Sequence, residues 1–150
     1  MERLPYIDEH SRSIGAARER AWAALISIGA ELGASAPVRV VRLARLEPRG
    51  ATGDWSGEPS AGATRPGFAV KEVHAPSRLA LAGSHRFSRY SLVFELDEAG
   101  PDRTLIRART RAAFPGALGR AYRALVIASG GHRIVVGRLL RKIEARACSA

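Results

Sequence analysis

The chain has 150 residues, of which 46% are hydrophobic and 25% charged, and its formal net charge is +10. This length fits one domain over residues 1–150, and the apolar fraction excludes a disordered chain. No apolar run approaches the roughly 20 residues that span a bilayer, and the first residues lack the pattern of a secretory signal. The single cysteine, Cys148, has no partner for a disulfide within the chain. We therefore expect a cytoplasmic protein without a membrane span.

Arginine dominates the positive charge and is spread from Arg3 to Arg146. A nucleic-acid site would instead combine a basic cluster with exposed aromatic residues. The aromatic fraction is only 6%, and most of these residues occupy positions typical of a core. We therefore expect the charge to serve solubility and nucleic acid not to be the main partner.

The first half of the chain predicts strand, helix and strand. Residues 6–14 alternate between two faces and indicate an extended segment. The period becomes helical from Ala17, and Gly33 is the expected end of this helix. Residues 38–47, "VRVVRLARLE", are rich in β-branched residues and predict a second strand.

Residues 48–67 are dense in glycine, proline, serine and alanine and predict a flexible loop. This loop contains either a short strand near residues 51–55 or a mobile flap. Turn residues separate the four extended segments that follow, and the second of these turns is expected at Gly83–Arg86. The extended segments are residues 68–74, 79–83, 87–97 and 104–114.

The last segment predicts a long amphipathic helix from Leu118 onward. Its apolar residues advance by steps of four and three, which places them on one stripe. Gly130 and Gly131 lie in the middle of the helix and predict a kink, because glycine weakens a helix interior. The stripe consists of Tyr122, Leu125, Ser129, His132, Val136, Leu139 and Ile143.

Three stretches carry a resemblance to a known superfamily. "SRSIGAARERAWAAL" (11–25) is similar to its opening strand and helix, and "VHAPSRLAL" (73–81) to a connection within its sheet. "TRAAFPGALGRAYRAL" (110–125) is similar to its last strand and long helix. In this order the elements resemble the helix-grip fold of the START-like (SRPBCC) superfamily, which includes polyketide cyclases, aromatase-like proteins and plant pollen allergens.

The resemblance implies an α+β fold in which a curved antiparallel sheet of six to seven strands wraps around the C-terminal helix. It also implies a cavity between sheet and helix that suits an apolar or aromatic small molecule. It implies no reaction, because the fold hosts carriers, sensors and cyclases alike. No catalytic residue of the superfamily can be transferred to a position in this chain.

Ser129 of the apolar stripe is a ligand-binding candidate, and His132, at the centre of the stripe, is the first candidate for the site. It is either a cavity-lining imidazole that binds a ligand or acts as a general base, or a core histidine satisfied by the main chain. Tyr90 and Phe94 are further ligand-binding candidates, because alternation places both on the inward face of one strand.

His10 shares a strand face with Asp8 and Arg12, and this polar set either meets the ligand or lies at a wet sheet edge. Trp55 either caps the cavity or anchors its loop to the core. His85 and Arg86 form a rim candidate at the hairpin tip, which either steers an anionic ligand or is an ordinary solvated turn.

Arg107, Arg109 and Arg111 alternate on one strand and are expected to point outward into water. The rival interpretation is a basic face for RNA or an acidic partner. The histidines and the cysteine show no metal-ligand spacing, and no glycine-rich phosphate loop follows a strand, so we expect no metal and no cofactor.

Three functions stay open at this point. The first is binding or carriage of an apolar or aromatic small molecule by a monomer or homodimer. The second is a polyketide cyclase or dehydratase, with His132 as its general base. The third is a basic interaction protein.

Overall fold

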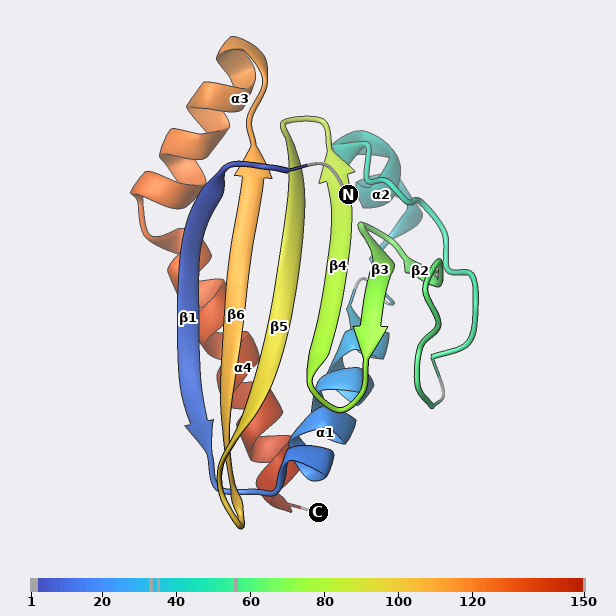
Figure 1. The fold of residues 1–150 in the computed structure, drawn as a ribbon. Coiled ribbons are helices and arrows are strands. Elements are labelled where there is room, and N and C mark those ends of the chain that lie inside the picture. The colour runs from blue at the N-terminus through green and yellow to red at the C-terminus, as the bar shows by residue number, and fades with distance from the viewer. Residues whose placement is uncertain (1–2, 33, 35, 56, 150) are drawn as a thin grey trace.

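The computed structural model describes residues 3–32, 34, 36–55 and 57–149. Six antiparallel strands form one curved sheet in the order β1-β6-β5-β4-β3-β2, and helices α1 and α4 lie behind it (Figure 1). The strands are β1 (Tyr6–Ile14), β2 (Thr64–Arg65), β3 (Phe68–His74), β4 (Arg78–His85), β5 (Ser88–Gly100) and β6 (Arg103–Ala113). The helices are α1 (Arg18–Glu31), α2 (Val38–Ala44), α3 (Gly116–Arg123), the π-helical η1 (Ala124–Ala128) and α4 (Gly131–Ser149).

This arrangement confirms the predicted α+β helix-grip fold. The alternation on the central strands is also confirmed, because one face of β6 is buried and the other is half-buried. Leu92 of β5 pairs with Thr110 of β6, and Phe94 pairs with Ala108, so these side chains share the concave face of the sheet. That face meets the helices.

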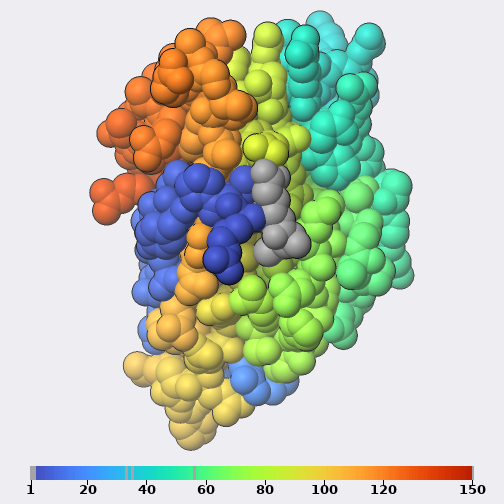
Figure 2. All heavy atoms as spheres, turned by 45° about the horizontal axis from the view of Figure 1, so that its top comes forward, coloured from blue at the N-terminus to red at the C-terminus, as the bar shows by residue number. Residues whose placement is uncertain are grey.

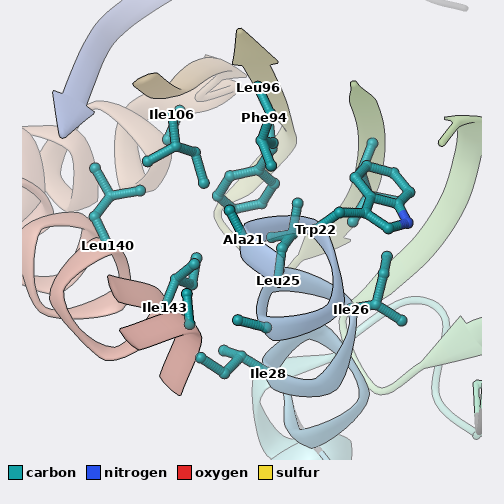
Figure 3. Packing of buried hydrophobic residues seen from close by; sticks show 14 of the residues in the cluster. Ala21, Trp22, Leu25, Ile26, Ile28, Phe94, Leu96, Ile106, Leu140 and Ile143 are labelled. Atoms are coloured by element: carbon teal, nitrogen blue, oxygen red, sulfur yellow. The ribbon is translucent and has the colours of Figure 1, made fainter. Parts of the chain in front are cut away.

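One half of the concave face is filled by the hydrophobic core. Phe94 is almost fully buried there, among Leu25 of α1, Ile106 of β6 and Ile143 of α4 (Figure 3). Full burial of such a side chain contributes about 1.5–3 kcal/mol. The helices α1 and α4 are thereby fixed against one end of the sheet, and the other end stays available for a cavity.

Ion pairs add polar links around this core. Arg12 of β1 donates two hydrogen bonds to Glu144 of α4, at 2.9 and 3.1 Å. Glu31 of α1 accepts hydrogen bonds from Arg146 and Lys142 of α4, and the two cations hold the pKa of Glu31 below its usual value. These links join both the edge strand and α1 to α4.

The strand predicted over residues 38–47 is wrong: residues 38–44 form α2. The β preference of valine reflects packing on a half-buried sheet surface, and only Val41 of α2 is buried here. Glu47 is the one residue of this stretch that pairs with the sheet, through an antiparallel bridge to Ser84. Without strand neighbours, the arginine and leucine residues of this segment favour a helix.

The loop over residues 48–67 is attached to the core at several points. Trp55 is buried against Gly29 of α1, where a Cβ atom would lie 2.9 Å from the indole ring. Thr52 pairs with Thr64, and β2 then adds the last strand to the sheet. Of the two interpretations of this loop, the short strand near 51–55 is present only as the Thr52 bridge.

The C-terminal helix is interrupted where the sequence predicts a kink. Gly130 has a positive φ of 80°, which ends η1, and α4 begins at Gly131. The expected end of the first helix, Gly33, lies outside the described residues, and α1 ends at Glu31. In the described part of the chain, no helix is both long and apolar enough to cross a membrane.

Candidate functional site

A cavity of about 230 Å³ occupies the second half of the concave face, between the sheet and the segment α3–η1–α4. Its walls come from β4, β5 and β6 on one side and from these helices on the other, with Leu32 and Phe68 closing one flank. Most of its surface is apolar, and polar groups are few. The apolar lining consists mainly of Leu92, Ala112, Phe114, Val126, Ile127, Val135, Val136 and Leu139.

The π-helix decides which residues of the helical wall face the cavity. A π-helical turn holds more residues than an α-helical turn, so the regular stripe is shifted there. Val126 and Ile127 line the cavity, whereas Leu125 is 71% exposed. Ser129 is also exposed, and its hydroxyl donates to the carbonyl of Leu125, so it does not line the cavity as predicted.

Aromatic rings gather at one end of the cavity. His85 contacts Tyr122 edge to face, with ring centroids 4.8 Å apart, and Tyr122 stacks on Phe87 at 5.2 Å. Nδ1 of His85 accepts a hydrogen bond from the backbone N–H of Phe87, so the proton lies on Nε2, which donates to the hydroxyl of Ser88 at 2.9 Å. Burial lowers the pKa of His85 and favours this neutral form.

Tyr90 lies beside this cluster and supplies a polar group to the lining. Its hydroxyl donates to the carbonyl of Gly67 at 2.7 Å, and its ring packs edge to face on Phe68. Burial, with a smaller contribution from Tyr122, raises the pKa of Tyr90 to about 12. The phenol therefore stays protonated at neutral pH and holds β5 to the loop before β3.

A second polar cluster lies at the wall formed by β1, β6 and α4. Nε2 of His132 is 3.2 Å from Oδ1 of Asp8 and 3.2 Å from the hydroxyl of Thr110. The other oxygen of Asp8 is 3.1 Å from Nε2 of His10. His132 and Thr110 line the cavity, whereas Asp8 and His10 stand behind them.

A carboxylate can only accept a hydrogen bond, so the contact with Asp8 places the ring proton of His132 on Nε2. Nδ1 then carries the lone pair. This is the arrangement in which a carboxylate fixes the tautomer of a histidine that can take up a proton. Asp8 is thus the positioning residue of a histidine on the cavity lining.

Three further predicted ligand contacts lie away from the cavity. Phe94 is in the core, Trp55 is packed against α1, and His10 contacts Asp8 and is not on the cavity lining. The indole Nε1 of Trp55 is buried and has no hydrogen-bond partner among the described residues. For Trp55, the structure agrees with the interpretation as a loop anchor.

The predicted rim at the hairpin tip is divided by the structure. The turn lies at Arg86 and Phe87, since β4 ends at His85 and β5 begins at Ser88. His85 points into the cavity lining, whereas Arg86 is exposed and its guanidinium lies 5.1 Å from the ring centroid of Phe87. Ser88, which also lines the cavity, shares the strand face of Tyr90 and was detectable from that alternation.

The outward arginine row of β6 is paired with acidic or carbonyl groups. Arg107 forms an ion pair with Asp97, and Arg109 forms a 2.8 Å ion pair with Glu9. Arg111 donates to the carbonyl of Leu4. This row is therefore a compensated surface, and its guanidinium groups offer little free charge to a phosphate backbone.

Two other features bear on ligand choice. A second hollow, of about 870 Å³, lies on the outer face of the sheet, and its mainly apolar lining also carries the charged side chains of Glu47, Lys71, Glu72 and Arg89. These four charged groups make the hollow less suited to a fully apolar ligand. Among the described residues, no group of three histidine, cysteine or acidic side chains has an arrangement that could hold a metal ion.

Comparison with known proteins finds similarity in structure only. No family model matches the sequence, and no curated protein matches it. A conserved protein from Geobacillus kaustophilus is 16% identical, with a TM-score of 0.62 and 94% of both chains covered. Norcoclaurine synthase from Thalictrum flavum is 13% identical, with a TM-score of 0.62, 95% of this chain and 86% of that chain.

A START superfamily protein from Mycobacterium smegmatis is 15% identical, with a TM-score of 0.53, 96% of this chain and 98% of that chain. These sequence identities are too low to transfer an activity. The structural similarity establishes the fold alone. The chain has a helix-grip fold, as the three sequence stretches predict.

Proposed function

We propose that this protein binds a small apolar molecule, with one or two rings and a polar group, in the cavity between the sheet and α3–η1–α4. The observation that carries the proposal is the lining itself: aliphatic and aromatic side chains surround about 230 Å³, with polar groups at two separate places. Ligand pockets typically combine an apolar lining with a few placed polar groups.

The size of the cavity limits the ligand. Small-molecule pockets commonly measure about 300–1,000 Å³, and a dry cavity of about 150 Å³ already holds benzene. The volume here lies between these values, which favours one or two rings. Burial of the ligand supplies the affinity at about 25 cal/mol per Å² of apolar surface, and the polar groups set its orientation.

The polar groups of the lining indicate which hydrogen-bonding groups the ligand carries. The hydroxyls of Ser88 and Thr110 and the ring of His132 lie on the lining. A hydroxyl or carbonyl group on the ligand can form a hydrogen bond with Ser88 at one end of the cavity, or with Thr110 and His132 at the other. The monomeric or homodimeric state and the cytoplasmic location stay predictions from the sequence.

The experiment compares two tryptophan variants in titrations with 2-naphthol, a two-ring phenol. Val126→Trp fills the cavity, because Val126 is on its lining, whereas Leu118→Trp changes a side chain that is 70% exposed. We expect 2-naphthol to bind the wild type and Leu118→Trp alike and to lose at least about tenfold in affinity for Val126→Trp. Equal affinity for all three proteins would contradict binding in this cavity.

Native mass spectrometry of protein purified from its own host identifies the physiological ligand. Released molecules with one or two rings support the proposal. A protein that carries no released molecule and does not bind 2-naphthol would contradict the proposal and support a role in interaction with another macromolecule.

A second candidate function is acid–base catalysis on the bound molecule, and the contact between Asp8 and His132 favours it. In this function Nδ1 of His132 takes a proton from a carbon next to a ligand carbonyl, and the electron pair of that C–H bond moves to the carbonyl oxygen as an enolate. Asp8 is the positioning residue. The step needs no metal or cofactor.

Deuterium exchange into 2-tetralone, a two-ring ketone, tests this candidate. The wild type should accelerate exchange next to the carbonyl, and His132→Ala should lose about 10²–10⁴-fold of the rate while it still binds the ketone. Binding without any acceleration by the wild type would leave carriage as the function.

A further inference from the structure

The excess of basic over acidic residues is concentrated in two helical segments, of whose basic residues Lys142 is paired with Glu31. Residues 32–46 contain three basic residues and no acidic one, and residues 116–143 contain six basic residues and no acidic one. Nine of the ten net positive charges therefore belong to these segments. The arginine row of β6, by contrast, is paired with Asp97, Glu9 and the carbonyl of Leu4.

The same segments carry nearly all of the exposed large apolar side chains. Of the eight that are strongly exposed in the described part of the chain, only Tyr6 lies elsewhere. Leu43 is 73% exposed, Leu118 70% and Leu125 71%. Isolated exposed leucines are ordinary, but their confinement to acid-free helices indicates an interaction surface.

Of these helices, α2 and α3 lie at one end of the molecule, on either side of the β4–β5 turn, whereas α4 runs from there toward the opposite end (Figures 1 and 2). The backbone N–H of Arg86 in the turn donates to the carbonyl of Ala44 in α2 at 2.8 Å. On the other side, Tyr122 of α3 stacks on Phe87 of the turn. The two helices are thus fixed to the same hairpin tip.

The relevant side chains form what we call the helical end surface: Arg39, Arg42 and Leu43 from α2, and Leu118, Arg123 and Leu125 from α3–η1. All six are exposed. Within the described residues, none of these three arginines has an acidic partner. The nearest acid in sequence after α2, Glu47, binds Arg49 at 2.9 Å.

We infer that the helical end surface docks on an anionic lipid membrane. Aliphatic side chains enter the boundary between headgroups and acyl chains, and guanidinium groups bind lipid phosphates in pairs of hydrogen bonds. Each basic residue near an anionic membrane surface contributes to binding, and the combined apolar and electrostatic terms make the contact reversible.

Two other classes of partner fit the surface less well. Single-stranded RNA requires exposed aromatic rings for stacking, and the exposed apolar side chains of these helices are all aliphatic. Protein interfaces rely on aromatic anchors, and leucine and valine are under-represented among their energetic hot spots. A lipid membrane requires neither stacking aromatic rings nor aromatic anchors.

The position of this surface complements a cavity for apolar molecules. Val126 and Ile127 line the cavity and adjoin Leu125, and Tyr122 of α3 lies on the cavity lining as well. An apolar ligand could pass between bilayer and cavity with little exposure to water. The docking inference does not depend on this passage, because the charge and the exposed leucines carry it alone.

Vesicle sedimentation tests the inference with the full chain. We expect binding to vesicles of phosphatidylcholine that contain about one-third phosphatidylserine, with negligible binding to phosphatidylcholine alone. Raising the NaCl concentration from about 0.1 to about 0.5 M should weaken the binding, since the Debye length then falls well below 10 Å.

Two pairs of variants locate the contact. Arg42→Gln/Arg123→Gln should lose about 10- to 30-fold in affinity, whereas Lys71→Gln/Arg103→Gln, which removes two exposed charges from the sheet, should lose less than about threefold. Leu118→Ser should also lose affinity, whereas Tyr6→Ser, at an exposed site on β1, should not. Titration with 2-naphthol should be unchanged in all four variants, which separates this test from that of the cavity.

Several results would overturn the inference. Equal binding to both kinds of vesicle would exclude recognition of anionic lipid. Equal losses for the two charge variants would show a nonspecific effect of net charge. Binding of single-stranded RNA at about 0.15 M salt without any vesicle binding would assign the surface to nucleic acid instead.

Discussion

Oδ1 of Asp8 lies 3.2 Å from Nε2 of His132, although 124 residues separate the two in the chain. The contact joins the edge strand β1 to the first turn of α4. It also gives Asp8, on the polar face of β1, a hydrogen-bond partner on α4. Because its polar groups are paired, a strand face with Asp8, His10 and Arg12 can lie next to an apolar cavity.

The tautomer of His132 follows directly from this contact. We expect Nε2 to carry the proton and Nδ1 to carry the lone pair in the neutral ring. ¹⁵N NMR of the imidazole nitrogens checks this assignment. In Asp8→Asn the preference should weaken, because the neutral amide accepts a hydrogen bond less strongly than a carboxylate. A proton on Nδ1 in the wild type would contradict the proposed role of His132 as a base.

The pH dependence of stability should contain a contribution from His85. Burial lowers its pKa in the folded state, so the unfolded chain binds more protons in the window between that lowered pKa and about 6.5. The contribution to stability is thus present above about pH 6.5 and is lost as the pH falls through the folded-state pKa.

Urea unfolding between pH 5 and pH 8, at about one pH unit spacing, measures this effect, and His85→Gln should flatten the profile. His74→Gln is the matched control, because His74 is exposed on β3. Identical profiles for the wild type and His85→Gln would show that His85 does not contribute.

The core at the opposite end of the concave face should dominate the free energy of unfolding. Phe94→Ala removes an almost fully buried ring, and we expect a loss of about 3–5 kcal/mol. Leu118→Ala, at an exposed position, should change stability by less than about 0.5 kcal/mol. Chemical denaturation measures both, and a small loss for Phe94→Ala would place the core elsewhere.

The ion pair between Arg12 and Glu144 should contribute little despite its two hydrogen bonds. The side chains are 37% and 31% exposed, and solvent screens such a pair. A double-mutant cycle with Arg12→Ala and Glu144→Ala should give a coupling energy below about 1 kcal/mol. A larger value would make β1 a more rigid wall of the cavity than its edge position implies.

The strands and the inward faces could be predicted because period-two alternation is a local property. Leu92 and Thr110 follow it, and both line the cavity. The pairing of Asp8 with His132 could not be predicted, because it depends on how the edge strand and α4 meet. The sequence indicated only that each side chain points toward the same interior.

Two errors have a common physical origin in tertiary context. Residues 38–44 have the composition of a strand, but they have no strand neighbour and form α2 against the hairpin tip. Leu125 and Ser129 continue the helical stripe, but the π-helix shifts the facing residues to Val126 and Ile127. Neither the missing neighbour nor the wider turn has a reliable sequence signal.

Methyl NMR of the wild-type protein during titration with 2-naphthol shows directly whether a small molecule enters the cavity. We expect saturable shifts for methyl groups on the cavity lining, at Leu92, Val126 and Leu139, and little change for Leu25 and Ile28 in the core. Saturable shifts confined to the core or to the outer face of the sheet, or no saturable shift at all, would contradict a ligand cavity between the sheet and the C-terminal helices.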